Sequence, residues 1–380
     1  MSFSFWIAFF IFLFFVICLV VLGMRAYFVN SCKRKEVLNT CQNIEPSETI
    51  FVSIPSYRDP ELSKTIVDLF TQASCPFRIV VGVCNQNNND LRESFKNTNV
   101  PFTNDFGRFL STNMRVENVP YEKAKGPAIA RASIEKKLYN GEKYYMMIDS
   151  HMRFMPEWDR VAIENLQACP SPRSIITMYP SGYNRHNSDV TFDPEEKVTF
   201  LKAKGNTDRG FITLEGSPFS TKPIRPLPQL FWTPCFSFTY AVAHLEVPYD
   251  YHLRNLFLGE EILMSARLWT SGWDFYTPMK MIVKHLWDRN YRPTFWELRG
   301  DSTTAEQRGQ VLLGIRPPNS VHEKVTKNLE KFSLGQNRSL ADYENFVDCK
   351  FDKALIGPRA TLGLSPDYPQ DEKLAKHGQL

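Results

Sequence analysis

Short apolar runs alternate with helical patterns in this chain, and no other feature limits its fold as strongly. Residues 49–54 have the pattern of a strand, residues 60–73 that of an amphipathic helix and residues 77–83 that of a second strand. A helix over 127–139 and a strand over 143–148 continue the alternation. Strands joined by helices pair in parallel through right-handed crossovers. The sequence therefore predicts an α/β domain with a mostly parallel sheet, whose ligands bind beyond the carboxyl ends of the strands.

Composition narrows the class of protein. Hydrophobic residues make up 43% and charged residues 23%, a balance typical of a chain with a buried core. The net charge of +4 gives no basic field for nucleic acid, and no nucleic-acid-binding motif is present. The eight cysteines lack CxxC spacing, which argues against a structural zinc site or a disulfide scaffold. Cys75 and Cys84 are therefore expected to be buried thiols.

The first residues differ from the rest of the chain. Residues 3–23 are uncharged and apolar, and their 21 positions are enough to span a bilayer as a helix. A cleaved signal peptide would need a charged start and a small-residue cleavage site, which the segment lacks. We expect a membrane anchor over 1–24, a stem over 25–48, a main domain over 49–320 and a C-terminal extension and tail over 321–380.

The first candidate site follows the first predicted strand, in the segment SIPSYRDPE. A loop that leads from a strand into a helix N-terminus suits a nucleotide, because free backbone N–H groups favour anions. Tyr57 can stack on a base, Arg58 can contact a phosphate, and Asp59 can accept a hydrogen bond from a ribose or a base. The alternative is a helix cap with a surface arginine.

The second candidate site combines the segment AKGPAIAR with the end of a strand. Lys125, Gly126 and Arg131 lie at the start of a predicted helix, and the strand KYYMMI leads into Asp149 and His151. In an extended segment these last two side chains point to the same side and can converge on one ion. A carboxylate and an imidazole suit a divalent ion of the manganese or zinc type. A buried structural histidine is the alternative.

The third candidate site contains adjacent acids. Glu260 and Glu261 follow a glycine in an otherwise apolar run, and His285 follows a short strand-like segment. The acids can be a plain helix start, where carboxylates interact with the helix dipole, or buried groups that face a substrate. His285 supplies a third ligand for the ion.

These motifs, in this order, resemble a known family. IFVSIPSYRDPEL, AKGPAIAR, YYMMIDSHMRF, GEEILMSARLWTSGWDFYTP and HLW are similar to the polypeptide N-acetylglucosaminyltransferases of the GlcNAc family, whose members modify hydroxyproline or the threonines of mucin-type proteins. The motif order also resembles that of the mucin-type GalNAc transferases. The resemblance covers residues 49 to about 315.

The resemblance implies a GT-A glycosyltransferase fold, a UDP-sugar donor, a Mn²⁺ ion and a protein or peptide acceptor. It implies that Asp149, His151 and His285 bind the metal and that Glu260, with Glu261 beside it, faces the sugar or the acceptor. It also implies that anomeric configuration is retained. The nucleotide would contact Arg58, with Lys125 and Arg131.

Three questions stay open at the level of sequence. The donor can be UDP-GlcNAc or UDP-GalNAc. A metal-dependent hydrolase could use the same metal ligands, with Glu260 as base, and a membrane-tethered binding protein would need no metal. The positive residues after the anchor favour a cytosolic domain, whereas the anchored relatives favour the Golgi lumen, for which the only Asn-x-Ser/Thr site, Asn337, is a reporter.

Overall fold

The computed structural model describes residues 48–91, 95, 112–186, 190–298 and 300–367. Within these ranges no helix is long and apolar enough to cross a membrane. The anchor predicted over 1–24 lies outside the described residues, as does the predicted stem apart from its last residue.

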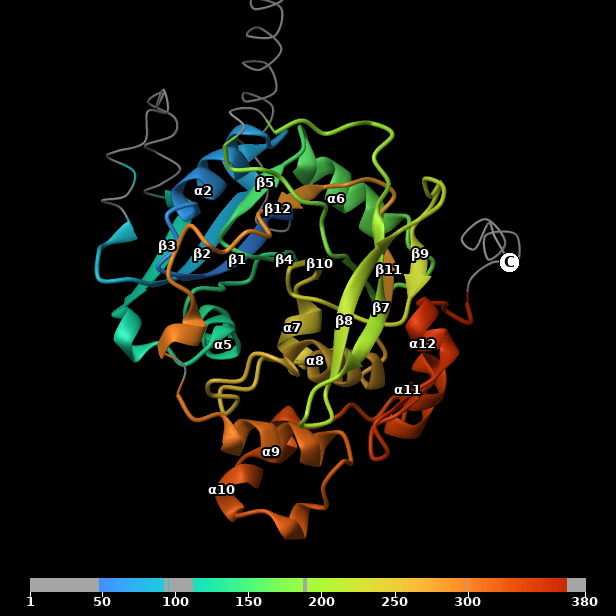
Figure 1. Cartoon of the computed structure of the whole chain (residues 1–380). Helices are drawn as coiled ribbons and strands as arrows, with labels where there is room; N and C mark the ends of the chain where they lie inside the picture. Colours follow the sequence, from blue (N-terminus) through green and yellow to red (C-terminus); the bar gives the residue numbers. More distant parts are fainter. Residues whose placement is uncertain (1–47, 92–94, 96–111, 187–189, 299, 368–380) are drawn as a thin grey trace, which may run out of the picture.

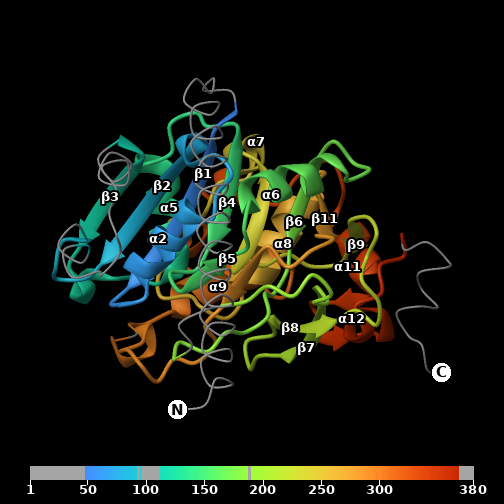
Figure 2. The same ribbon diagram turned by 90° about the horizontal axis from the view of Figure 1, so that it is seen from above.

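An eight-stranded sheet forms the centre of the described structure, in the order β3-β2-β1-β4-β10-β6-β11-β9. Figure 2 shows these strands side by side from β3 to β9. The strands of this sheet are β1 (Ile50–Tyr57), β2 (Ile79–Gln86), β3 (Met114–Val119), β4 (Tyr144–Ile148), β6 (Ser174–Thr177), β9 (Leu227–Gln229), β10 (Phe236–Tyr240) and β11 (Asp274–Thr277). Strands β1 to β4 pair in parallel, as the alternation in the sequence predicts, and so do β6 and β11.

Three small two-stranded sheets complete the β-structure. They are β5 (Met152–Phe154) with β12 (Val283–His285), β7 (Thr199–Asn206) with β8 (Ile212–Pro218), and β13 (Cys349–Lys350) with β14 (Leu355–Ile356). All three pairs are antiparallel.

Helices cover both faces of the central sheet. They are α2 (Leu62–Thr71), α5 (Pro127–Lys137), α6 (Trp158–Gln167), α7 (Val242–Glu246), α8 (Glu260–Thr270), α9 (Thr303–Leu312), α10 (Glu323–Thr326), α11 (Leu340–Val347) and α12 (Pro358–Leu362). Short 3₁₀ turns are η2 (Pro76–Arg78), η4 (Tyr121–Lys123), η5 (Phe295–Leu298), η6 (Pro318–Ser320) and η7 (Leu329–Phe332). Figure 1 shows α2 and α6 above the sheet and α5 and α8 below it.

The two faces of the sheet bury separate hydrophobic clusters because successive strand residues point to opposite sides. On β1, Ile50, Val52 and Ile54 pack in the cluster under α2 and α6. Phe51 packs in the other cluster, together with residues of α5 and α8. The predicted first helix begins and ends within two residues of α2, and its predicted apolar face, which includes Ile66, is buried.

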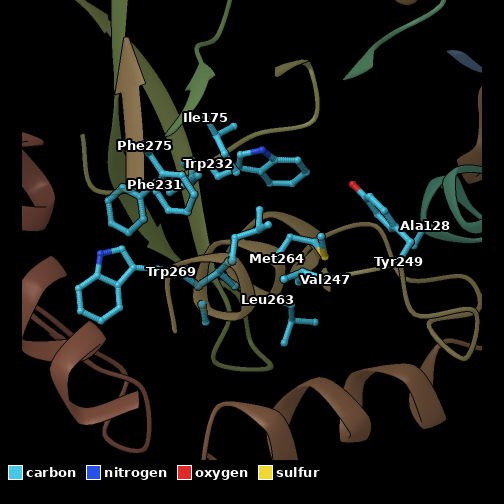
Figure 3. Close-up of a cluster of buried hydrophobic side chains, with 14 of the residues drawn as sticks. Ala128, Ile175, Phe231, Trp232, Val247, Tyr249, Leu263, Met264, Trp269 and Phe275 are labelled. Atoms are coloured by element: carbon cyan, nitrogen blue, oxygen red, sulfur yellow. The ribbon is translucent and has the colours of Figure 1, made fainter. Parts of the chain in front are cut away.

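Helix α8 is buried on nearly every side, which fixes the position of the acids at its start. Figure 3 shows Leu263 and Met264 of α8 among Trp232, Phe275 and other large side chains. The helix begins after Gly259, whose φ of 109° favours glycine. A Cβ atom there would also lie 2.9 Å from the ring of Phe211.

Strand β10 interrupts the parallel order and places Cys235, which was not predicted as a site residue, near the end of β4. It runs antiparallel to β4, with Phe236 opposite Ile148. Residues just before β10 therefore lie beside residues just after β4. Strand β12 acts similarly, because its pairing with β5 places His285 opposite Met152.

The C-terminal segment and the cysteines are the remaining features about which the sequence led to expectations. The segment after residue 320 contributes Tyr343, Val347 and Phe351 to the cluster around α8, and the Tyr343 hydroxyl donates to the Leu230 carbonyl at 3.2 Å. Cys84 is a free, buried thiol as expected. The expectation for Cys75 is wrong, because it is disulfide-bonded, and the other described cysteines are free.

Candidate active site

A cleft of about 260 Å³ opens at the carboxyl ends of β1 and β4. This is the position where mostly parallel sheets bind ligands. Residues from all three predicted sites line the cleft: Tyr57, Gly126, Arg131, Asp149, His151, Glu260 and Glu261. Sequence segments more than 200 residues apart, from Tyr57 to Glu261, thus converge on one cavity.

Asp149 and His285 form the most direct contact between two of the predicted sites. The Nε2 atom of His285 lies 3.2 Å from Oδ2 of Asp149. Asp149 follows β4, and His285 is the last residue of β12. The pairing of β12 with β5 brings them together, since Met152 of β5 lies three residues beyond Asp149 and opposite His285.

Burial and the neighbouring groups together set the charge states of His285 and Asp149. His285 is fully buried, and burial lowers its pKa to about 4, although Asp149 acts in the opposite direction. His285 is therefore neutral at pH 7. Burial opposes the ionisation of Asp149, but the hydrogen bond with His285 and the charge of Arg131 outweigh it and lower the pKa of this carboxyl group.

His151 lies beside this pair, but its hydrogen-bond partner is a residue outside the pair. The chain bends at Ser150 and His151, and the rings of His151 and His285 are 4.5 Å apart. The Nδ1 atom of His151 lies 2.7 Å from Oδ2 of Asp59. His151 is thus a neighbour of His285 through a ring contact, but the donor atoms that lie within 4.8 Å of one another are those of Asp149, His285 and Cys235. Asp149 and His151 are not part of an extended strand.

Arg131 joins two of the predicted acids. Its guanidinium group donates from Nη1 to Glu260 at 2.9 Å and from Nη2 to Asp149 at 3.1 Å. Helix α5 carries Arg131 toward the cleft after Gly126, which has a φ of 96°. Burial opposes the charge of Arg131, but Glu260 and Asp149 contribute to outweighing it and raising its pKa.

Glu261 has a different environment from Glu260. It accepts hydrogen bonds from the hydroxyl groups of Tyr179 and Thr233, both at 2.6 Å. Burial raises the pKa of Glu261 to about 7, while these two hydrogen bonds lower it. Burial also raises the pKa of Glu260, and Arg131 opposes that change.

Three residues predicted to bind the nucleotide, Arg58, Asp59 and Lys125, lie outside the lining of the cleft. The Arg58 guanidinium carbon lies 4.2 Å from the ring centre of Tyr121, and its φ is 49°. The backbone carbonyl of Lys125 accepts a hydrogen bond from the backbone N–H of Asn255 at 2.7 Å. Asp59 is buried, with its side chain fully enclosed.

Several residues of the cleft were not singled out in the sequence. Cys235 lines the cleft, and its Sγ lies within 4.8 Å of ligand atoms of Asp149 and His285. It reaches this position because β10 runs antiparallel to β4, which the local pattern does not reveal. The segment after His285 contributes Trp287, Arg289 and Arg292 to the lining. The close spacing of these three cationic and aromatic residues was the signal in the sequence that this segment could line a binding site.

The donor atoms fit a divalent cation. Asp149 offers an ionised carboxylate, and His285 offers a neutral imidazole close to it. Nε2 of the neutral His285 donates to Asp149, and its buried Nδ1 has no hydrogen-bond partner among the described residues, so a cation at Nε2 would take the place of that hydrogen. Without a bound ion, burial raises the pKa of the Cys235 thiol well above its ordinary value. Oxygen donors suit Mn²⁺, imidazole suits several transition metals, and a thiolate would favour Zn²⁺.

Comparison with solved structures identifies the fold. GalNAc-T7, solved with UDP, GalNAc and Mn²⁺, matches with a TM-score of 0.53 and 13% identity over 80% of this chain. The match spans 55% of the GalNAc-T7 chain. A mannosyltransferase from Pyrobaculum calidifontis, PcManGT, matches with a TM-score of 0.41 and 10% identity, covering 83% of this chain and 80% of its own. The fold is that of a GT-A-like glycosyltransferase.

The family follows from sequence. The profile of the family described as Glycosyltransferase (GlcNAc) matches residues 49–101 and 88–353, and the chain belongs to this family. A search of curated proteins finds no match. The chain is therefore a glycosyltransferase, and the hydrolase and the non-catalytic binding protein are not supported.

Proposed function

We propose that this enzyme transfers GlcNAc from UDP-GlcNAc to a hydroxyl group of threonine, serine or hydroxyproline in a protein acceptor, with Mn²⁺ and with retention of anomeric configuration. The observation that carries the proposal is the contact of Asp149 with both Arg131 and His285. Asp149 and Arg131 line the cleft at the carboxyl ends of β1 and β4, and His285 is fully buried beside Asp149. Such a site combines a place for a cation with a fixed positive charge, as transfer from a nucleotide diphosphate requires.

The family and the fold support the donor. The family description names GlcNAc, and GalNAc-T7 binds UDP, GalNAc and Mn²⁺. A UDP-sugar and Mn²⁺ are therefore the first donor and cofactor to test here. UDP-GalNAc is the competing donor, because the structural relative binds GalNAc.

Asp149, His151 and His285 would hold the metal. A divalent cation supplies positive charge to the diphosphate as the sugar–phosphate bond breaks. The chain adds its own positive charge nearby. Arg131 is fixed by two carboxylates, and the exposed Arg289, whose guanidinium carbon lies 5.7 Å from the ring centre of Phe257, also lines the cleft.

The nucleotide and the acceptor would contact opposite parts of the cleft. Tyr57 lines the cleft at the end of β1, and Gly126 lines it at the start of α5. We place the nucleotide there, with Arg58 and Lys125 at the margin of the cleft. Glu260 and Glu261 would orient hydroxyl groups of the sugar and the acceptor. Glu261 is suited to exchange a proton near neutral pH because its pKa is about 7.

A donor screen tests this function. The full-length chain in detergent micelles is mixed with Mn²⁺ and with each UDP-sugar in turn, and UDP release is measured with and without threonine- and hydroxyproline-containing peptides. We expect peptide-dependent UDP release and a mass gain of one N-acetylhexosamine with UDP-GlcNAc. Transfer with UDP-GalNAc alone would contradict the donor, and UDP release without a glycosylated peptide would contradict the acceptor class.

We also propose that residues 1–24 anchor the enzyme in a membrane with its main domain in the Golgi or ER lumen. The disulfide bond of Cys75 supports this side, because such bonds persist in oxidising compartments. The positive residues that follow the segment favour the cytosol instead. Deletion of residues 1–24 is expected to release the protein from sedimented membranes.

Asn337 reports the side of the membrane. It is exposed, and its Nδ2 donates to the carbonyl of Ser271 at 2.9 Å, which leaves the second amide hydrogen available. We expect a glycosidase-sensitive increase in mass that Asn337→Gln removes. Digestion of the domain by protease added to sealed microsomes would show that it faces the cytosol.

A further inference from the structure

Asp59 is a buried carboxylate that the sequence assigned to a nucleotide but that the structure surrounds with protein donors. Its side chain is fully enclosed. Oδ1 accepts from the backbone N–H of Glu61 and the hydroxyl of Tyr291, both at 3.0 Å. Oδ2 accepts from the Ser150 hydroxyl at 2.6 Å and lies 2.7 Å from Nδ1 of His151. The Nε of Arg292 lies 3.3 Å from Oδ2.

The contact with His151 fixes the position of a proton. A carboxylate surrounded by donors can only accept, so Nδ1 of His151 carries the hydrogen. The Ser150 hydroxyl lies 3.3 Å from the same nitrogen, but its single hydrogen is directed to Asp59 over the shorter distance. A neutral imidazole protonated at Nδ1 has its lone pair at Nε2.

We propose that Asp59 is a positioning residue, which holds His151 with the proton on Nδ1 so that Nε2 is free to bind a divalent cation beside Asp149 and His285. The proposal rests on the metal site of the proposed function and adds to it a residue that does not contact the metal. A carboxylate that accepts from the far nitrogen of a histidine ligand fixes the ring and strengthens the ligand.

The other contacts of Asp59 give it a second effect on the cleft. Tyr291 and Arg292 lie in the segment after β12, and Arg292 also donates from Nη1 to the Tyr57 carbonyl at 3.1 Å. One buried carboxylate therefore connects the end of β1, the turn after β4 and the segment after β12. Nothing in this arrangement leaves an oxygen of Asp59 for a ribose.

Asp59→Asn tests the proton position with the smallest change of shape. The backbone N–H of Glu61 cannot become an acceptor, so the amide oxygen must take the place of Oδ1. The NH₂ group then faces His151 Nδ1, which has to accept. The proton moves to Nε2 and blocks the atom that would bind the metal.

Glu61→Gln is a matched control. Glu61 is equally buried and lies two residues away, but its carboxylate contacts Lys64 at 2.7 Å and Arg153 at 2.5 Å and does not contact His151. Both variants exchange one buried carboxylate for an amide, and both lose an acceptor of charged or polar donors. Only Asp59→Asn changes the partner of His151.

The first experiment measures Mn²⁺ affinity by calorimetry on the full-length protein and both variants. We expect the dissociation constant to rise about 10–100-fold in Asp59→Asn and to stay within a factor of about two in Glu61→Gln, where the metal ligands keep their contacts. A folded Asp59→Asn protein with unchanged affinity would overturn the proposal, as would an equal loss in both variants.

The second experiment reads the proton position in the unchanged protein. ¹⁵N spectra of histidine-labelled, metal-free protein at pH 8, assigned with His151→Gln, are expected to show His151 protonated at Nδ1. Protonation at Nε2 would overturn the proposal even if Asp59→Asn failed to fold. If the unchanged protein bound no Mn²⁺, the metal dependence of the proposed function would fail, while these spectra would still decide the role of Asp59.

Discussion

Two adjacent glutamates at the start of α8 have contrasting environments. Glu260 belongs to an Arg131 cluster, defined as Arg131, Asp149 and Glu260, in which two carboxylates share one buried cation. Glu261 belongs to a Glu261 cluster, defined with Tyr179 and Thr233, in which only hydroxyl groups contact the acid. Consecutive helical residues point about 100° apart, so one turn of helix supplies both clusters.

The comparison shows that neighbouring residues of the same type need not have the same role. The Arg131 cluster holds fixed charges of both signs, which suits it to position a charged donor. Among the described residues no cation lies within hydrogen-bonding distance of Glu261, and the pKa of about 7 of this acid suits proton exchange. Four predictions separate the two clusters, in order of decreasing effect.

Loss of His285 next to the Arg131 cluster is expected to have the largest effect. His285→Ala removes the imidazole that contacts Asp149 and should abolish Mn²⁺-dependent UDP release. UDP release and Mn²⁺ binding are measured together with the thermal unfolding midpoint. The exposed His186 provides the control, since His186→Ala should leave all three unchanged. Near-normal turnover of His285→Ala would show that His285 is not a metal ligand.

Arg131→Met is expected to have the largest effect on stability. Removal of the cation leaves Asp149 and Glu260 without their shared partner, and breaking a buried ion pair in this way costs about 3–5 kcal/mol of unfolding free energy. Urea unfolding measures the change. Adding Glu260→Gln to Arg131→Met should recover part of the loss. A loss below about 1 kcal/mol, as for an exposed pair, would mean that Arg131 does not hold the two acids.

The sequence predicted much of the fold because many elements have local patterns. The parallel strands β1, β2 and β4 and the helices α2 and α5 follow from apolar periodicity, which depends on near neighbours. The antiparallel strand β10 was not predicted. Its place between β4 and β6 depends on pairing between residues about 60 to 96 positions apart, which no local pattern encodes.

The candidate site shows the same division. Residue types and their place after strands brought Asp149, His151 and His285 into one hypothesis, and the structure makes them neighbours. The partners could not be predicted. Cys235 lies in the site because β10 runs antiparallel to β4. Asp59 is of a residue type that often binds ligands, but it is buried against His151. The sequence thus predicted the candidate reactive residues well, but it did not predict the residues that they contact.

Glu261→Gln tests the pH dependence that distinguishes the Glu261 cluster. A carboxyl group whose pKa is higher in the folded than in the unfolded protein binds its proton more tightly when folded. Its contribution to stability is full below about pH 4.5 and is lost as the pH rises through about 7. Because one pKa unit corresponds to about 1.4 kcal/mol, the loss is up to about 3 kcal/mol.

The measurement is the unfolding free energy of both proteins at several pH values between about 4.5 and 7. Glu261→Gln does not titrate, so the difference between the two proteins should change across this range in the stated direction. A parallel series with Glu260→Gln controls for loss of a neighbouring acid. A difference between Glu261→Gln and the unchanged protein that does not vary with pH would show that Glu261 ionises normally in the fold.

Thr233→Val is expected to have the smallest effect and to adjust the Glu261 cluster without removing its acid. The Thr233 hydroxyl donates to Glu261 at 2.6 Å, and this bond stabilises the ionised form. Without it the pKa of Glu261 should rise further, and stability at pH 8 should fall by about 1 kcal/mol. Thr233→Ser keeps the hydroxyl and should behave as the unchanged protein. If Thr233→Val left the pH dependence of unfolding where it was, the Tyr179 hydroxyl alone would be sufficient to set the pKa of Glu261.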